Sequence, residues 1–84
     1  MPQKTRPLWL LDAPWALKEI AAKPHYHNSP LALIAGPERI EADWWDNDDV
    51  NRDYFVAQTR DQSMLWIYRE RRTPGGWYLH GIFG

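Results

Sequence analysis

The sequence has no cysteine among its 84 residues. A chain without cysteine has neither a disulfide nor a thiolate ligand for zinc, so its stability depends on packing and a reducing, cytoplasmic setting is expected. The chain also lacks an excess of one charge, because ten Lys and Arg stand against eleven Asp and Glu, a formal net charge of −1. The overall positive field that dominates non-specific binding to nucleic acid is therefore missing.

Long hydrophobic runs are missing as well. The apolar run at 8–11 is short and ends at Asp12, so the sequence shows neither a membrane span nor a signal peptide. One domain is expected from 84 residues, since two cores would each fall below the size that folds unaided.

Aliphatic residues are scarce and tryptophan is abundant. Leu, Ile, Val and Phe supply 17 residues, against six Trp and four Tyr. Large rings must therefore fill much of the core. We expect Trp66 and Trp77, in adjacent predicted strands, to be core residues. Trp44 and Trp45 are consecutive, so in a strand their rings must point to opposite faces.

From residue 31 onward, short apolar or alternating runs separated by turn residues predict an antiparallel meander. The fold class is therefore mainly β, with about five strands in a curled sheet or partly open barrel. Gly36-Pro37 is expected to end the first strand, because proline donates no ladder hydrogen bond. Residues 65–68 are apolar on both faces, which predicts a central strand. The expected strands are 31–35, 39–45, 52–59, 64–71 and 77–83.

The first thirty residues are expected to form a segment that packs on the β domain of residues 31–84. Residues 7–11 are expected to be an extended segment. Residues 13–23 are considered as one short helix, with Asp12 as N-cap and Pro24 as its stop, and whether that helix forms stays open. Residues 24–30 are expected to be a mobile loop.

Sites for metals, cofactors and catalysis are not expected. Of His25, His27 and His80, two lie in the predicted loop and have no cysteine beside them, which disfavours zinc. The acidic turn at 46–49 starts like a calcium loop but lacks the required glycine and the distal glutamate. The sequence has no nucleophile elbow, phosphate loop or dinucleotide motif, so we expect no enzyme.

Arginines beside aromatic residues point to one possible nucleic-acid site. Small β modules bind single-stranded DNA by stacking bases on exposed rings while arginines hold the phosphates. The competing interpretation is that the rings fill the core and the arginines solubilise a strand end. The candidate nucleic-acid-binding residues are Trp66, Tyr68, Arg69, Arg71, Arg72, Trp77 and Tyr78.

Five motifs carry a resemblance to a known family. They are Gly36-Pro37-Glu38-Arg39-Ile40-Glu41, Asp43-Trp44-Trp45-Asp46, Arg52-Asp53-Tyr54-Phe55-Val56, Leu65-Trp66-Ile67-Tyr68-Arg69-Glu70 and Trp77-Tyr78-Leu79-His80-Gly81-Ile82-Phe83. In this order they resemble the C-terminal domain of ImuB-like proteins, which are bacterial Y-family DNA polymerase homologues. The stretch at 7–11 resembles, more loosely, the segment that precedes that domain.

The resemblance implies a fragment of a longer protein that lacks polymerase activity and acts in the SOS mutagenic complex, in translesion synthesis and DNA repair. In this family the partners are the sliding clamp, an ImuA-type RecA-like protein and an error-prone C-family DNA polymerase. Residues 3–8 lack the spacing of a clamp-binding motif, so clamp contact is expected upstream. We therefore expect a non-catalytic protein-interaction domain, with single-stranded DNA binding as the alternative.

Polar residues within these motifs are the candidate contacts, because a core would not require them. An alternative stays open, in which Arg39, Glu38, Asp53 and His80 satisfy one another in a hydrogen-bonded network that sets strand register. The candidate partner-binding residues are Arg39, Trp44, Trp45, Arg52, Arg69 and His80.

Overall fold

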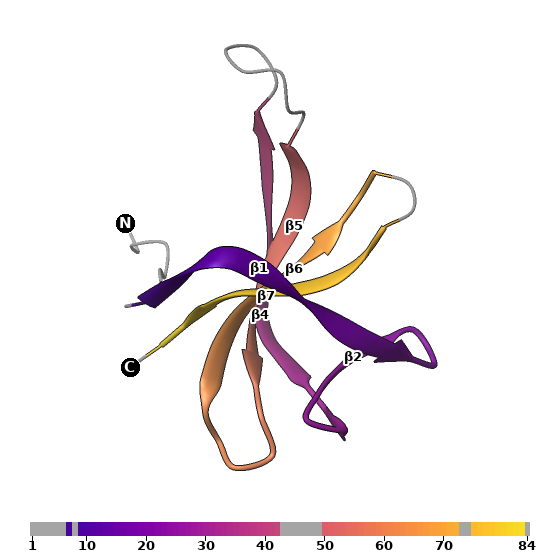
Figure 1. Ribbon diagram of the computed structural model, residues 1–84, viewed down its shortest axis with the longest axis vertical. Coiled ribbons are helices and arrows are strands. Elements are labelled where there is room, and N and C mark those ends of the chain that lie inside the picture. Colours follow the sequence, from indigo (N-terminus) through magenta and orange to yellow (C-terminus); the bar gives the residue numbers. More distant parts are fainter. Residues whose placement is uncertain (1–6, 8, 43–49, 73–74, 84) are drawn as a thin grey trace.

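A computed structural model of the chain describes residues 7, 9–42, 50–72 and 75–83, and within these ranges every regular element is a strand. The strands form one antiparallel sheet in the order β3-β2-β1-β7-β6-β5-β4. Figure 1 shows the strands crossing near a common centre, with the hairpins pointing in different directions. The bounds are β1 Trp9–Ile20, β2 Lys23–Tyr26, β3 Ser29–Pro30, β4 Ala32–Ala42, β5 Val50–Gln58, β6 Met64–Glu70 and β7 Gly76–Ile82.

The mainly β, curled antiparallel fold predicted from the sequence is confirmed. Strands β4 to β7 follow one another as a meander, and β6 is central, with β5 and β7 on either side. The sheet described here has seven strands, not about five. The additional strands come from the first thirty residues, where β1 pairs with β7 and so joins the two ends of the described chain.

The helix considered for residues 13–23 is wrong. Trp15, Ala16 and Leu17 lie in β1 and pair with β7. Ala21 and Ala22, which favour helix in isolation, form the β1–β2 turn with φ of 53° and 65°. Helix propensity is a weak preference that tertiary pairing overrides, and here residues 15–17 pair with β7 while residues 18–20 pair with β2.

The mobile loop expected at 24–30 is also wrong, because these residues form most of a small hairpin. Strand β2 pairs with β3 through Tyr26 and Ser29, and His27 and Asn28 make the two-residue turn with φ of 51° and 65°. Positive φ at both turn positions is what a tight hairpin requires. The Leu31 N–H donates to the Pro24 carbonyl at 3.0 Å, which ties the hairpin to the start of β4.

One strand, β4, replaces the two predicted at 31–35 and 39–45. Gly36-Pro37 does not end it; the ladder with β5 shifts register on either side of Ala35 and continues from Glu38. Proline is tolerated here because β4 is an edge strand, where one side of the backbone needs no ladder partner. Gly36 has φ of 118°, and a Cβ at this position would lie 2.6 Å from the Tyr54 carbonyl oxygen.

The central strands bury residues on both faces, as the apolar pattern at 65–68 predicts. Leu65 and Ile67 belong to the main core, together with Leu31, Ala57, Trp77 and Leu79. On the other face, Tyr54, Trp66 and Tyr68 form a second buried cluster. The expected placement of Trp66 and Trp77 in the core is confirmed, with exposed fractions of 7% and 5%. Trp9 and Trp15 are exposed instead, at 59% and 56%.

Glycine at position 81 lets β1 approach β7 closely. A Cβ on Gly81 would lie 2.8 Å from the Trp9 carbonyl oxygen and 2.6 Å from Cγ of Pro7. Any larger side chain must therefore push the start of β1 away from the sheet. This contact explains how a strand with mostly exposed side chains is held in place.

Candidate interaction site

Register between β5, β6 and β7 gathers aromatic residues on one side of the sheet, called here the aromatic face. Tyr54 lies opposite Tyr68, which in turn lies opposite Tyr78. The Tyr54 ring stacks on Trp66 with a centroid distance of 4.1 Å, and Tyr68 stacks on Tyr78 at 5.2 Å. The fifth member is His80, whose ring stacks with both Trp66 and Tyr54.

A register shift in β7 brings His80 onto this face. Ile67 pairs with Leu79, and the preceding residue Trp66 pairs with Gly81. His80 is therefore an extra residue in β7 that has no pairing partner in β6. An extra residue of this kind bends the strand and changes the direction of a side chain. His80 therefore lies within ring contact of both β5 and β6.

Arg52, Tyr54 and His80 form a hydrogen-bond chain. Arg52 Nη1 donates to the Tyr54 hydroxyl at 3.1 Å, and this hydroxyl lies 2.7 Å from Nδ1 of His80. Because arginine only donates, the Tyr54 oxygen accepts from Arg52. The Tyr54 hydroxyl therefore links Arg52 on β5 to His80 on β7.

Burial and the charge of Arg52 together set the electrostatics of the aromatic face. Burial and the nearby guanidinium of Arg52 lower the pKa of His80, which favours the neutral ring. Burial raises the pKa of Tyr68, with Arg52 opposing the shift. Burial by itself would lower the pKa of Arg52, but its hydrogen bond to Tyr54 and the surrounding charges raise it.

Ring packing also holds the Arg52 side chain. Its guanidinium carbon lies 4.3 Å from the centroid of Tyr68, a cation–π contact. Its Nε is buried and has no hydrogen-bond partner within the described part of the chain. Arg52 is thus fixed by Tyr54 and Tyr68 and is not a freely moving surface cation.

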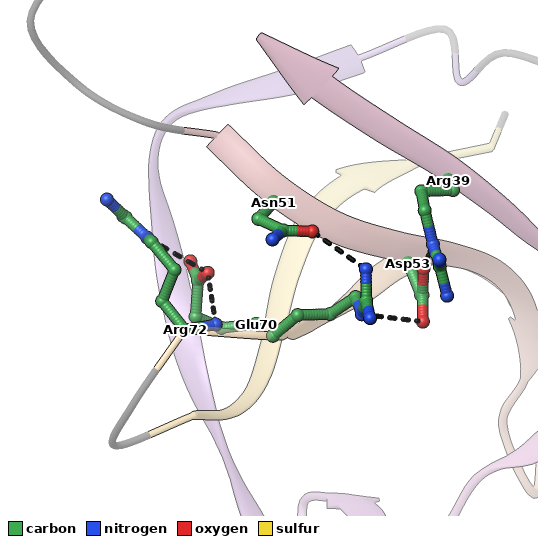
Figure 2. A network of polar contacts seen from close by, with 6 residues as sticks. Arg39, Asn51, Asp53, Glu70 and Arg72 are labelled. Atoms are coloured by element: carbon green, nitrogen blue, oxygen red, sulfur yellow. Dashed lines mark hydrogen bonds and ion pairs between the residues drawn. The ribbon is translucent and has the colours of Figure 1, made fainter. Parts of the chain in front are cut away.

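A second cluster, called here the ionic network, lies where β5 begins and β6 ends (Figure 2). Arg39 Nε donates to Asp53 at 3.0 Å, and Arg71 Nε lies 3.8 Å from the other Asp53 oxygen. Arg71 also donates to the Asn51 side chain at 3.0 Å. The Glu70 carboxylate accepts from both the backbone N–H and Nε of Arg72, at 3.1 and 3.3 Å.

Arg69 lies in the same cross-strand row as this network. Its position is opposite Asp53 on one side and opposite Trp77 on the other. The guanidinium carbon is 6.0 Å from the Trp77 ring centroid. Arg69 is exposed and makes no hydrogen bond or ion pair within residues 7, 9–42, 50–72 and 75–83.

The predicted partner-binding residues are therefore divided between two faces. Side chains alternate along a strand, so Arg52 and Asp53 point in opposite directions. Arg52 and His80 meet through Tyr54, whereas Arg39 and Arg69 flank Asp53 on the other side. The remaining candidates, Trp44 and Trp45, lie outside the described residues, as does the acidic turn at 46–49.

The predicted nucleic-acid-binding residues do not form one exposed platform. Trp66 and Tyr68 are buried in the aromatic face, and Trp77 is buried in the main core. Tyr78 is half-buried against Tyr68. Arg71 and Arg72 are exposed but engaged with carboxylates.

The structural network considered from the sequence is present only in part. Arg39 and Asp53 do pair, but His80 bonds to Tyr54 rather than to a charged residue. Tyr54 is the member of this hydrogen-bond chain that sequence reasoning missed. The signal was present, because strand alternation places Arg52 and Tyr54 on the same face.

The described residues offer neither a cluster of metal ligands nor a helix that could span a membrane. Within the described residues, no group of three or more His, Asp or Glu side chains is placed to hold a metal ion. His25 Nδ1 lies 3.0 Å from the Lys23 carbonyl, and His80 is engaged by Tyr54. No helix long and apolar enough to cross a membrane occurs in the described ranges.

Comparison with known proteins relates the whole chain to one kind of protein. Over an alignment 105 positions long, it is 29% identical to protein ImuB of Caulobacter vibrioides strain NA1000 / CB15N. The identity to ImuB of strain ATCC 19089 / CIP 103742 / CB 15 is the same. The chain is similar to a region of ImuB. Each alignment covers 99% of the chain but only 23% of the relative, so the chain spans less than a quarter of that protein's length. No family model and no solved structure matches the chain.

Proposed function

We propose that this chain is a non-catalytic protein-interaction domain of an ImuB-like protein and docks partners of a DNA-damage-induced mutagenic complex. The observation that carries the proposal is the similarity to ImuB, which extends over 99% of the chain. The five motifs of residues 36–83 point to the same family independently, and to its C-terminal domain. The proposed partners are an ImuA-type RecA-like protein and an error-prone C-family DNA polymerase.

Arg39 and Arg69 are the partner contacts that this proposal favours among the described residues. Both are exposed and flank Asp53 in one cross-strand row. Arginine is enriched in binding hot spots because its planar group makes several hydrogen bonds at once. Arg52 and His80 would act differently, by holding the aromatic face rigid beneath any contact.

A role without catalysis is supported by how His80 is engaged. Its Nδ1 is already engaged by the Tyr54 hydroxyl, and burial lowers its pKa. Neither serine of the chain lies in this chain of hydrogen bonds; Ser63 belongs to the β5–β6 turn and Ser29 to β3. The arrangement therefore offers a rigid surface rather than an activated nucleophile.

Co-purification tests the proposal directly. The chain is co-expressed with the ImuA-type protein and, separately, with the C-family polymerase of one organism, and each pair is purified through a tag on the chain. We expect at least one partner to be retained, and the single substitutions Arg39→Glu and Arg69→Glu each to weaken retention. Lys18→Glu, an exposed change of equal charge on β1, is the control. Loss of both partners from the wild-type chain contradicts the proposal.

Single-stranded DNA binding remains the alternative to be measured. Burial of Trp66, Tyr68 and Trp77 leaves little ring surface for bases to stack on. Titration of an oligonucleotide against tryptophan fluorescence at low salt separates the two functions. Quenching that weakens steeply as salt is added supports the DNA alternative. We expect no response up to about 100 μM, the weak end of ordinary non-specific affinity.

A further inference from the structure

A hollow of about 510 Å³ lies away from the aromatic face and the ionic network. It opens between the β2–β3 hairpin at Tyr26 and His27 and the β5–β6 turn at residues 59–63. Leu65 and Ile82, which are cross-strand partners, form its floor. We call this hollow the hairpin groove. Its size lies within the range of ligand-binding clefts.

Hydrogen bonds in one wall and ring stacking in the other make the hairpin groove a preformed feature. In the β5–β6 turn, the Thr59 N–H donates to the Ser63 carbonyl at 2.9 Å, and the Gln62 N–H donates to the Thr59 carbonyl at 3.0 Å. On the opposite wall, the Tyr26 and His27 rings stack with a centroid distance of 4.0 Å. A ligand entering such a groove has little ordering of the walls to oppose it.

The floor continues into an exposed aromatic residue. Trp9 pairs with Ile82 across β1 and β7, so their side chains lie side by side on the same face, roughly 5 Å apart at Cβ. Trp9 is 59% exposed. An apolar strip therefore runs from buried Leu65 through Ile82 to Trp9, and an exposed tryptophan beside a hollow is a typical hot-spot arrangement.

The charges that line the hairpin groove indicate what chemistry it accepts. The Asp61 carboxylate is turned into its own loop, where it accepts from the Thr59 hydroxyl and the Ser63 N–H. Arg60, beside it, makes no hydrogen bond or ion pair within the described ranges. Arg60 is thus the uncommitted charge at the rim, and it is complementary to a carboxylate.

We propose that the hairpin groove binds an extended peptide segment of a partner protein, in which a large apolar side chain enters the groove and an adjacent carboxylate pairs with Arg60. This inference rests on the proposed interaction function and assigns it a site. One cation and an apolar floor suit a peptide better than nucleic acid, which is held by many phosphate contacts. The apolar strip at Trp9 extends the contact beyond the reach of a small ligand.

Backbone and indole NMR shifts of the 84-residue chain test the site with three blocked dipeptides. The probes are N-acetyl-phenylalanyl-aspartyl amide, its asparaginyl counterpart, and N-acetyl-glycyl-aspartyl amide. We expect the first to shift the amides of Leu65 and Ile82 and the indole of Trp9. It should bind about two- to fivefold more tightly than the asparaginyl probe, the range of an exposed ion pair, and the glycyl probe should not bind.

Two variants make the test specific. Arg60→Gln should abolish the preference for aspartyl over asparaginyl, while Lys18→Gln, an exposed control on β1, should retain it. Ile82→Ser should lose binding of both phenylalanyl probes; if that variant unfolds, Arg60→Gln still decides the outcome. Two results overturn the inference. One is NMR shift changes at residues outside the hairpin groove, and the other is a preference for aspartyl over asparaginyl that Arg60→Gln leaves unchanged.

Other occupants give different results. If a second copy of the chain fills the hairpin groove, sedimentation will show a dimer that Ile82→Ser dissociates, and that result overturns the peptide assignment. Co-purification without dipeptide binding would leave the proposed function standing and reject this site. Failure of co-purification with clear dipeptide binding would reject the proposed partners instead.

Discussion

The Tyr54 hydroxyl lies 2.7 Å from Nδ1 of His80, although the residues are 26 positions apart and belong to strands that do not pair with each other. Strand β6 lies between β5 and β7, so this bond spans it above Trp66 and Tyr68. The contact requires correct register on both sides of β6 together with the extra residue in β7. It therefore reports on the folded state of all three central strands.

Removal of the Tyr54 hydroxyl should destabilise the domain. Tyr54→Phe leaves Nδ1 of the half-buried His80 without its hydrogen-bond partner and takes one acceptor from Arg52. The expected loss is about 1–2 kcal/mol in the free energy of unfolding, measured by urea denaturation. Tyr78→Phe is the matched control, because the Tyr78 hydroxyl makes no hydrogen bond in the described structure. Equal losses in the two variants would contradict the hydrogen-bond chain.

Stability should fall as the solution is acidified below neutrality. The folded pKa of His80 lies below its ordinary value of about 6.5, so the unfolded chain binds the proton more readily. The stabilising contribution is complete above that ordinary value and is lost as pH falls through the folded pKa. NMR titration of the imidazole, with urea denaturation at several pH values, measures both quantities. His80→Gln should flatten the dependence; an unchanged slope would show that other groups cause it.

Substitution of Gly81 tests how β1 is held. In Gly81→Ala the new methyl group meets the Trp9 backbone oxygen, so β1 must move away from β7. Overpacking of this kind typically costs about 1–3 kcal/mol. The free energy of unfolding and the fluorescence of the exposed Trp9 report the change. Ala16→Ser, exposed in the same strand pair, should alter stability by less than about 0.5 kcal/mol.

The main core should be far more sensitive than the exposed edge. Ile67 has no exposed surface, and Ile67→Ala should lower the free energy of unfolding by about 2–5 kcal/mol. Ile34 is 53% exposed on the edge strand β4, so Ile34→Ala should cost about 0.5 kcal/mol or less. Chemical denaturation of both variants measures the contrast. Similar costs would mean that β4 is covered in solution.

The central strands could be predicted from the sequence because their signals are local. Leu65 and Ile67 alternate with Trp66 and Tyr68, and a period of two with apolar residues on both faces indicates a covered strand. The first thirty residues could not be predicted, since Ala21 and Ala22 favour helix locally but form the β1–β2 turn, and β1 itself pairs with distant β7. The prediction that Gly36-Pro37 ends a strand was wrong for a similar reason. In an edge strand such as β4, the missing backbone N–H of proline need not cost a ladder hydrogen bond.

The candidate site could also be predicted only in part. The motifs single out one set of polar residues, namely Arg39, Arg52, Arg69 and His80. The motifs do not show that the folded sheet divides this set between two faces. The link between Arg52 and His80 runs through Tyr54, across a strand that neither belongs to. The hairpin groove could not be predicted from the sequence. Its walls, at Tyr26 and His27 and at residues 59–63, are more than thirty residues apart in the chain.

By itself, the sequence determined that this chain has no disulfide framework, that its core depends on aromatic rings, and that residues 31–83 favour antiparallel strands. These properties follow from composition and from periodicity between near neighbours. Only the tertiary structure decided that the first thirty residues add strands to the sheet, that His80 meets Tyr54, and that Trp9 lies beside a groove. Each of those results depends on pairing between distant strands, where register and close approach at Gly81 outweigh local preference.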